Sequence, residues 1–99
     1  MKVKATNAFL AFARPAAATC IKEKGEILFL SYTHVETKFS KGLRWVLNVV
    51  AQPDFPGNPV MQVDDLAILY QPEVAEKLQS AVLDFRDRKI IIDSLPRCT

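Results

Sequence analysis

Alternation of side chains over Leu43–Ala51 constrains the fold more than any other feature of this sequence. One face of this extended segment carries four large apolar side chains, namely Leu43, Trp45, Leu47 and Val49. The opposite face carries Val46 and Val50 among polar residues, so it is also partly covered. The segment therefore predicts a strand that belongs to a packed sheet.

Short apolar runs predict five further strands, which are Ile27–Val35, Val60–Val63, Leu66–Tyr70, Leu83–Phe85 and Ile90–Ile92. The second and third of these form a short antiparallel hairpin, with Asp64 and Asp65 as turn residues. The last two flank a charged turn at Arg86–Lys89, which is most simply a solvated surface turn.

A first helix is predicted to begin at Ala8, with Thr6 or Asn7 as its cap. Pro15 lies inside the helical pattern. Because proline removes one backbone hydrogen bond, we expect a kink or a short break there. Gly25 is the expected stop, since glycine readily takes the left-handed conformation that ends helices.

A second helix is predicted to begin with Pro72 at its first position. Its buried stripe is Val74, Leu78 and Ala81 or Val82. The order is then helix, two strands, hairpin, helix, two strands. This order argues against a doubly wound parallel sheet and predicts an α+β fold, a small mixed or antiparallel sheet with two helices.

Ninety-nine residues suffice for one hydrophobic core, so we expect a single domain over residues 1–99. A net charge of +2 is too weak for a nucleic-acid footprint, and no apolar run approaches the ~18 residues of a membrane span. Residues 1–50 carry eight basic and three acidic groups, whereas residues 51–99 carry five basic and eight acidic groups. This asymmetry would orient a partner only if the fold separates the two halves.

The two cysteines, Cys20 and Cys98, are too few for a disulfide framework, although they could form one bridge in an oxidising compartment. In a cytosolic protein we expect free thiols, or one buried and one reactive thiol. Together with His34 they supply the elements of a thiolate–imidazole site. Their spacing matches no paired zinc-ligand pattern, and no third group marks a nucleophilic dyad. We therefore predict no catalytic and no metal site, and we interpret His34 as a partly exposed structural residue.

Arg44 and Phe55 are the candidate contacts with a partner. Arg44 belongs to a basic segment around Trp45, a combination that can grip single-stranded nucleic acid. Trp45 lies on the apolar side of its strand, however, and we assign it to the core. Phe55 stands in the proline-rich loop 52–59, where it either docks back on its own core or anchors a partner.

From Gly42 onward the order of apolar and turn residues follows a recognisable pattern. It runs through Gly42-Leu43, Trp45-Val46-Leu47, Pro56-Gly57, Val60, Val63-Asp64, Leu66–Leu69, Pro72, Leu78, Ala81, Leu83-Asp84-Phe85 and Ile92-Asp93. This pattern resembles the HesB/IscA-like family, the A-type iron–sulfur cluster carriers. The resemblance implies a HesB-like fold.

Members of that family typically hold a cluster with three cysteines, one in a G-G-C-S-G-like turn and two in a C-terminal Cys-Gly-Cys. Here Ser40 stands at the first position, and only Cys98, followed by Thr99, remains of the second motif. Clusters need soft thiolate donors, and a serine hydroxyl does not ionise near neutral pH. The resemblance therefore implies the scaffold together with an incomplete ligand set.

We accordingly expect a non-enzymatic HesB/IscA-like binding or interaction domain that has lost iron–sulfur cluster binding and holds no cofactor. One alternative is an iron–sulfur or metal carrier assembled across a dimer through Cys98. Another is a thiol-dependent enzyme that uses Cys98 or Cys20 with His34. Exposed strand edges and a thin core favour a homodimer or a protein partner. We expect a cytoplasmic protein that binds neither membrane nor nucleic acid.

Overall fold

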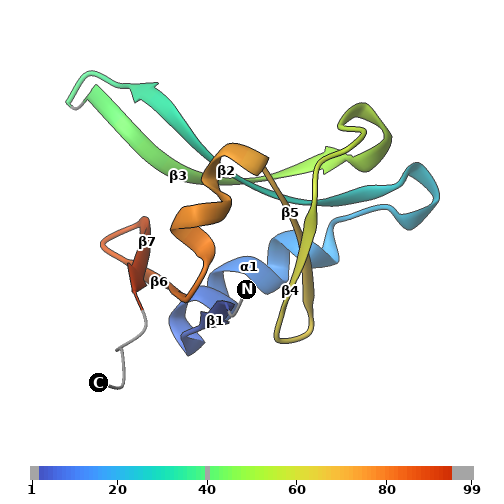
Figure 1. Ribbon diagram of the computed structural model, residues 1–99, viewed down its shortest axis with the longest axis horizontal. Helices are drawn as coiled ribbons and strands as arrows, with labels where there is room; N and C mark the ends of the chain where they lie inside the picture. Colours follow the sequence, from blue (N-terminus) through green and yellow to red (C-terminus); the bar gives the residue numbers. More distant parts are fainter. Residues whose placement is uncertain (1–2, 40, 95–99) are drawn as a thin grey trace.

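A computed structural model describes residues 3–39 and 41–94 of the chain. Its strands are β1 (Val3–Ala5), β2 (Glu26–Glu36), β3 (Lys41–Ala51), β4 (Val60–Val63), β5 (Leu66–Tyr70), β6 (Ala81–Arg86) and β7 (Lys89–Ser94). Its helices are α1 (Asn7–Ala18) and three 3₁₀ helices, η1 (Lys22–Lys24), η2 (Gln52–Asp54) and η3 (Pro72–Leu78). The predicted α+β class is confirmed, as Figure 1 shows.

The strands form two mixed sheets. The larger sheet has the order β3-β2-β5-β4, in which β2 runs antiparallel to β3 and parallel to β5. The smaller sheet has the order β1-β6-β7, in which β6 runs parallel to β1 and antiparallel to β7. Within the described residues β3 and β7 are therefore edge strands, and the two edges lie close to each other.

Helix α1 begins where the sequence predicts it. The Thr6 hydroxyl accepts a hydrogen bond from the Phe9 backbone N–H at 3.2 Å and so caps the helix. The expected break at Pro15 is absent, since the helix continues to Ala18. Proline removes the hydrogen bond to the carbonyl of Ala11, and both residues are exposed. Water can therefore solvate that carbonyl, and the helix stays intact.

Gly25 does not stop this first helix, which corrects the sequence-based expectation. It ends η1 instead, in a left-handed conformation with φ of 69°. Its carbonyl accepts a hydrogen bond from the Gln52 N–H at 2.8 Å, and a β-carbon would stand 3.1 Å from Pro53 Cδ. Glycine here allows the loop after β3 to close against the turn before β2.

The main core lies where α1 meets both sheets. Phe9, Leu10 and Ala13 of the helix are buried there. The larger sheet and η3 add Leu28, Leu30, Met61, Val63, Leu66, Ile68, Tyr70, Val74 and Leu78, and β6 adds Ala81 and Leu83. One helix face thus joins two sheets that, over residues 3–39 and 41–94, share no hydrogen-bonded strands.

The opposite face of the larger sheet is covered by the proline-rich loop. Phe29 and Leu69 are cross-strand neighbours on this face, and both are buried. The ring of Phe55 packs edge-on against that of Phe29, with centroids 4.8 Å apart. Of the two predicted roles of Phe55, packing on its own core or anchoring a partner, the structure therefore shows the packing on its own core.

The second predicted helix is the 3₁₀ helix η3, with Pro72 in its first turn and Val74 and Leu78 buried. It ends at Leu78, and Ala81 belongs to β6 instead of to the helix. Burial then alternates along β6, since Ala81 and Leu83 are buried and Val82 is not. Strand β6 therefore begins at Ala81, two residues before the predicted strand Leu83–Phe85.

A polar network ties the start of α1 to the smaller sheet. The Thr6 hydroxyl donates to the Asp84 carboxylate at 2.7 Å, and the Phe85 N–H donates to the same oxygen at 2.8 Å. Arg86 forms ion pairs with Asp84 at 2.9 Å and with Asp93 at 3.2 Å. The hydrogen bond from Thr6, followed by that from the Phe85 N–H, lowers the pKa of the Asp84 carboxyl.

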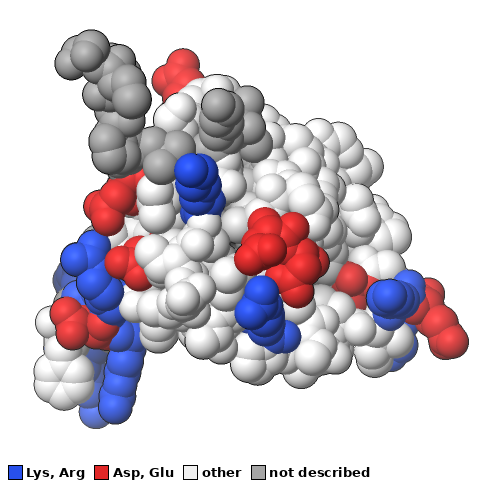
Figure 2. Space-filling view, turned by 90° about the horizontal axis from the view of Figure 1, so that it is seen from below, with Lys and Arg blue, Asp and Glu red and all other residues white. Residues whose placement is uncertain are grey.

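The charge asymmetry of the sequence does not become a separation in space. Strand β1 pairs with β6 and β2 pairs with β5, so the two halves of the chain are interleaved. On the face shown in Figure 2, basic and acidic side chains are mixed. No helix among the described residues is long and apolar enough to cross a membrane.

Candidate functional site

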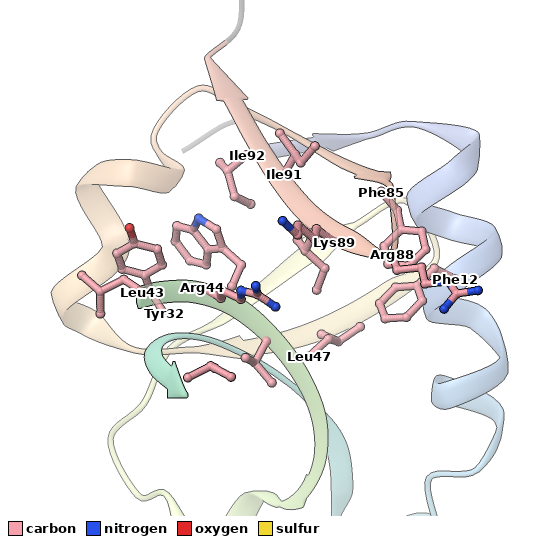
Figure 3. A pocket seen from close by; sticks show the side chains of 14 residues that line it. Phe12, Tyr32, Leu43, Arg44, Leu47, Phe85, Arg88, Lys89, Ile91 and Ile92 are labelled. Atoms are coloured by element: carbon pink, nitrogen blue, oxygen red, sulfur yellow. The ribbon is translucent and has the colours of Figure 1, made fainter. Parts of the chain in front are cut away.

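A cleft of about 600 Å³ lies between the edge strands of the two sheets (Figure 3). Strand β3 lines it from Leu43 to Leu47, and β7 lines it from Lys89 to Ile92. Residues from α1, β2, β6 and the β6–β7 turn complete the walls: Phe12, Tyr32, Val35, Phe85 and Arg88. Small-molecule sites have similar volumes, about 300–1,000 Å³, so the cleft is large enough to bind a ligand.

Two aromatic pairs form opposite walls of the cleft. Phe12 of α1 stacks on Phe85 of β6, with centroids 4.1 Å apart and an angle of 7° between the rings. Tyr32 and Trp45 are cross-strand neighbours on β2 and β3, and their centroids are 4.8 Å apart. Because these pairs come from both sheets and from the helix, the shape of the cleft depends on how the sheets pack together.

The polar side chains of the cleft are mainly basic. Arg44 comes from β3, Arg88 from the β6–β7 turn and Lys89 from the start of β7. The cationic ends of Arg44 and Lys89 lie between the two aromatic pairs in the view of Figure 3. No aspartate or glutamate is among the described residues that line the cleft. The electrostatic potential inside it therefore favours an anion.

The hairpin turn that carries Arg88 is tight. Asp87 and Arg88 both adopt positive φ, 53° and 62°, which is the geometry of a two-residue turn that matches the twist of its strands. Glycine or asparagine is the usual residue at such a position, because a side chain there is strained. Arg88 thus lines the cleft from a backbone conformation unfavourable for arginine, and its side chain extends past Phe12 towards α1 in Figure 3.

The candidate residues from the sequence are distributed unevenly. Arg44 lines the cleft, whereas Phe55 packs on the other face of the larger sheet. Trp45 is partly buried against the core, as expected, and it also lines the cleft. Cys98 and Ser40 both lie outside the described residues.

Cys20 and His34 are not brought together. Cys20 follows α1 and lies near Glu26, which is the first residue of β2. His34 lies two residues before the last residue of the same strand. His34 is eight positions further along β2 than Glu26, which corresponds to about 26 Å. The Cys20 thiol donates to the Ala16 carbonyl at 3.8 Å, and burial, with the Glu26 carboxylate, raises its pKa. Residues 3–39 and 41–94 contain no group of three His, Cys, Asp or Glu side chains arranged to hold a metal ion.

Sequence reasoning missed the contribution of the β6–β7 hairpin to this site. It interpreted Arg88 and Lys89 as part of a solvated turn, and it assigned Phe12 no role. One available signal was the uninterrupted apolar run Ile90–Ile92, which indicates a strand with covered surfaces on both sides. The charged residues that directly precede such a strand, here Arg88 and Lys89, are then close to the elements that pack on the strand.

Two solved structures share this fold. A protein from Lactobacillus salivarius assigned to Fe–S biosynthesis, described as having a novel fold, is 10% identical with a TM-score of 0.58, and the match covers 93% of this chain and 82% of that one. Escherichia coli SufA, which is involved in the biosynthesis of iron–sulfur clusters, is 17% identical with a TM-score of 0.55, and the match covers 94% and 83%. No family model and no curated protein matches the sequence. The likeness establishes the fold, which this chain shares with these two proteins.

Proposed function

We propose that this chain is a non-enzymatic binding domain, built on the fold of the A-type iron–sulfur carriers, that no longer carries a cluster itself. The observation that supports binding most directly is the cleft between β3 and β7, which is apolar, open and basic. A site of this composition retains a ligand by burial and by charge. None of the described residues that line it is a serine, cysteine, histidine or carboxylate that could form a nucleophile–base pair, so binding is the activity that it favours.

The thiols of the chain support the loss of cluster binding. A cluster needs several thiolate ligands, and this chain has two cysteines. Cys20 is partly buried, and its raised pKa keeps the thiol protonated, which makes it a poor ligand. Ser40 stands where the related pattern has a cysteine, and its hydroxyl is a hard donor. One chain would therefore offer Cys98 as its only suitable thiolate.

A protein partner or a second copy of the chain is part of the same proposal. Strand β3 is eleven residues long and has a neighbouring strand on one side only within the described part of the chain. Long edge strands favour pairing with another chain. Phe12 and Leu43 add exposed apolar surface beside that edge, with 37% and 57% of each residue exposed. Light scattering of the purified protein measures whether a dimer forms.

A second candidate function is a cluster carrier assembled across a dimer through Cys98. It is favoured by the likeness to SufA, which is involved in the biosynthesis of iron–sulfur clusters. Two chains would supply two Cys98 thiolates, and glutathione or another protein would complete the ligand set. This candidate and the first share the fold and differ in whether a cluster binds.

Anaerobic reconstitution with ferrous iron and sulfide distinguishes the two candidates. We expect no visible charge-transfer absorbance beyond that of a protein-free control after desalting. Stoichiometric absorbance that disappears in Cys98→Ala, and persists in the matched variant Cys20→Ala, would refute the proposal and support the carrier. Iron and sulfide analysis of the same samples makes the result quantitative.

A further inference from the structure

The cleft between β3 and β7 carries more positive charge than its surroundings neutralise. In the β6–β7 hairpin, Asp84 and Asp93 are both paired with Arg86. No ion pair with a described residue involves Arg88 or Lys89. The acidic groups of the hairpin strands are thus already engaged by one arginine, and the Lys89 ammonium, which lies inside the cleft in Figure 3, has no ion pair with a described residue.

The remainder of the lining is apolar. Eleven of its residues are aliphatic or aromatic: Phe12, Tyr32, Val35, Leu43, Trp45, Val46, Leu47, Phe85, Ile90, Ile91 and Ile92. An apolar body that packs on these side chains gains free energy because its own apolar surface and theirs leave water together. A small inorganic anion would leave most of this surface wet. A ligand that covers it needs an apolar body as well as a charge.

We propose that this cleft binds an amphipathic monocarboxylate, a small molecule with an alkyl or aryl body and one carboxylate. The inference rests on the proposed function, because it names the ligand class of the same site. The body lies between the aromatic pairs Phe12–Phe85 and Tyr32–Trp45. The carboxylate accepts a charge-assisted hydrogen bond from the Lys89 ammonium, which lies inside the cleft in Figure 3.

The strained turn provides a test of this assignment. Arg88 has φ of 62°, where glycine would be less strained, and it lines the cleft. Asp87 has the same backbone geometry as part of the same two-residue turn. Arg88→Gly is therefore expected to raise the thermal stability of the protein and, because it removes one positive charge near the cleft, to weaken binding of the carboxylate. A loss of binding in this variant could not be explained by unfolding.

Trp45 is the only tryptophan of the chain and lines the cleft, so its fluorescence reports on occupancy. The probes are dodecanoate, dodecyltrimethylammonium and 1-dodecanol, each below its aggregation limit, and 3-phenylpropanoate as an aryl carboxylate. Lys89→Gln removes a charge inside the cleft, and Lys24→Gln removes one in η1. Leu43→Asp places a negative charge at the wall of the cleft, and Val60→Asp does so on an exposed residue of β4.

We expect saturable binding of dodecanoate or of 3-phenylpropanoate, and the stronger of the two identifies the alkyl or aryl body. The carboxylate should bind about tenfold more tightly than the ammonium of equal length, the effect of one charge-assisted hydrogen bond. Lys89→Gln should weaken binding by about three- to tenfold, and Leu43→Asp by more. Lys24→Gln and Val60→Asp should leave it unchanged.

Two results would overturn the inference. If the ammonium and the alcohol bind as tightly as the carboxylate, the cleft binds ligands without selecting anions, and the proposed function survives without this refinement. If no probe changes the fluorescence of Trp45, or if Lys89→Gln and Lys24→Gln behave alike, the ligand class is wrong. The reconstitution experiment tests the proposed function separately, because it measures cluster formation and does not depend on the cleft.

Discussion

The packing of Phe55 on Phe29 leads to a quantitative prediction, since it attaches the proline-rich loop to the larger sheet through one aromatic side chain. Replacing Phe55 by alanine exposes about 100 Å² of apolar surface, which corresponds to about 2.5 kcal/mol. The lost edge-on ring contact adds about 0.5–1.5 kcal/mol, and the side-chain freedom regained offsets about 1 kcal/mol. We therefore expect Phe55→Ala to lower the free energy of unfolding by about 2–3 kcal/mol.

Urea or thermal unfolding followed by circular dichroism measures this change. In a domain of this size the loss corresponds to a fall in Tm of roughly 10–20 °C. Phe39→Ala is the matched control, because Phe39 is 95% exposed and its loss should change the free energy by less than about 0.5 kcal/mol. If the two variants are equally stable, Phe55 contributes nothing to the fold, and its predicted role as a partner contact becomes the better explanation of its presence.

Three further predictions concern individual polar groups. Thr6→Ala should cost at least about 1 kcal/mol of unfolding free energy through the lost helix cap, and Thr6→Ser should retain most of it. The pKa of Asp84 is lowered in the folded protein, chiefly by the hydrogen bond from Thr6. Its contribution to stability is therefore complete above the unfolded pKa of about 3.9 and is lost as the pH falls through the folded pKa. In Asp84→Asn the free energy of unfolding, measured at a series of acidic pH values, should therefore depend less steeply on pH than in the unaltered protein. Burial raises the pKa of Cys20, so iodoacetamide at pH 7 should alkylate Cys20 more slowly than a free model thiol, and fast alkylation mapped to Cys20 by mass spectrometry would contradict this assignment.

The strands were predictable from the sequence because the buried positions of a strand carry apolar side chains, which the sequence shows directly. The hairpin Val60–Val63 and Leu66–Tyr70 has the predicted bounds, and β2 and β3 extend their predicted segments by one or two residues at an end. Strand β1 was not predicted, because three residues are too few to display a period. It exists as a strand only through its pairing with β6.

The cleft could not be predicted because it belongs to neither sheet alone. Arg44 and Lys89 are separated by almost half of the chain, and they come together only when α1 packs the two sheets against each other. Periodicity describes which face of a strand is apolar, whereas the cleft arises at two strand edges. The resemblance to the A-type carriers predicted the fold correctly and drew attention to Ser40 and Cys98, which lie outside the described residues.

The parallel pairing of β1 with β6 joins residues near opposite ends of the sequence, Val3 with Ala81. During synthesis on the ribosome, the nascent N-terminal segment therefore has no strand to pair with until about four-fifths of the chain has emerged. Contacts of such long range slow folding, since the loop between them must close first. The smaller sheet should consequently form late, and a nascent chain stalled before β6 should remain open to proteases and chaperones along β1 and α1.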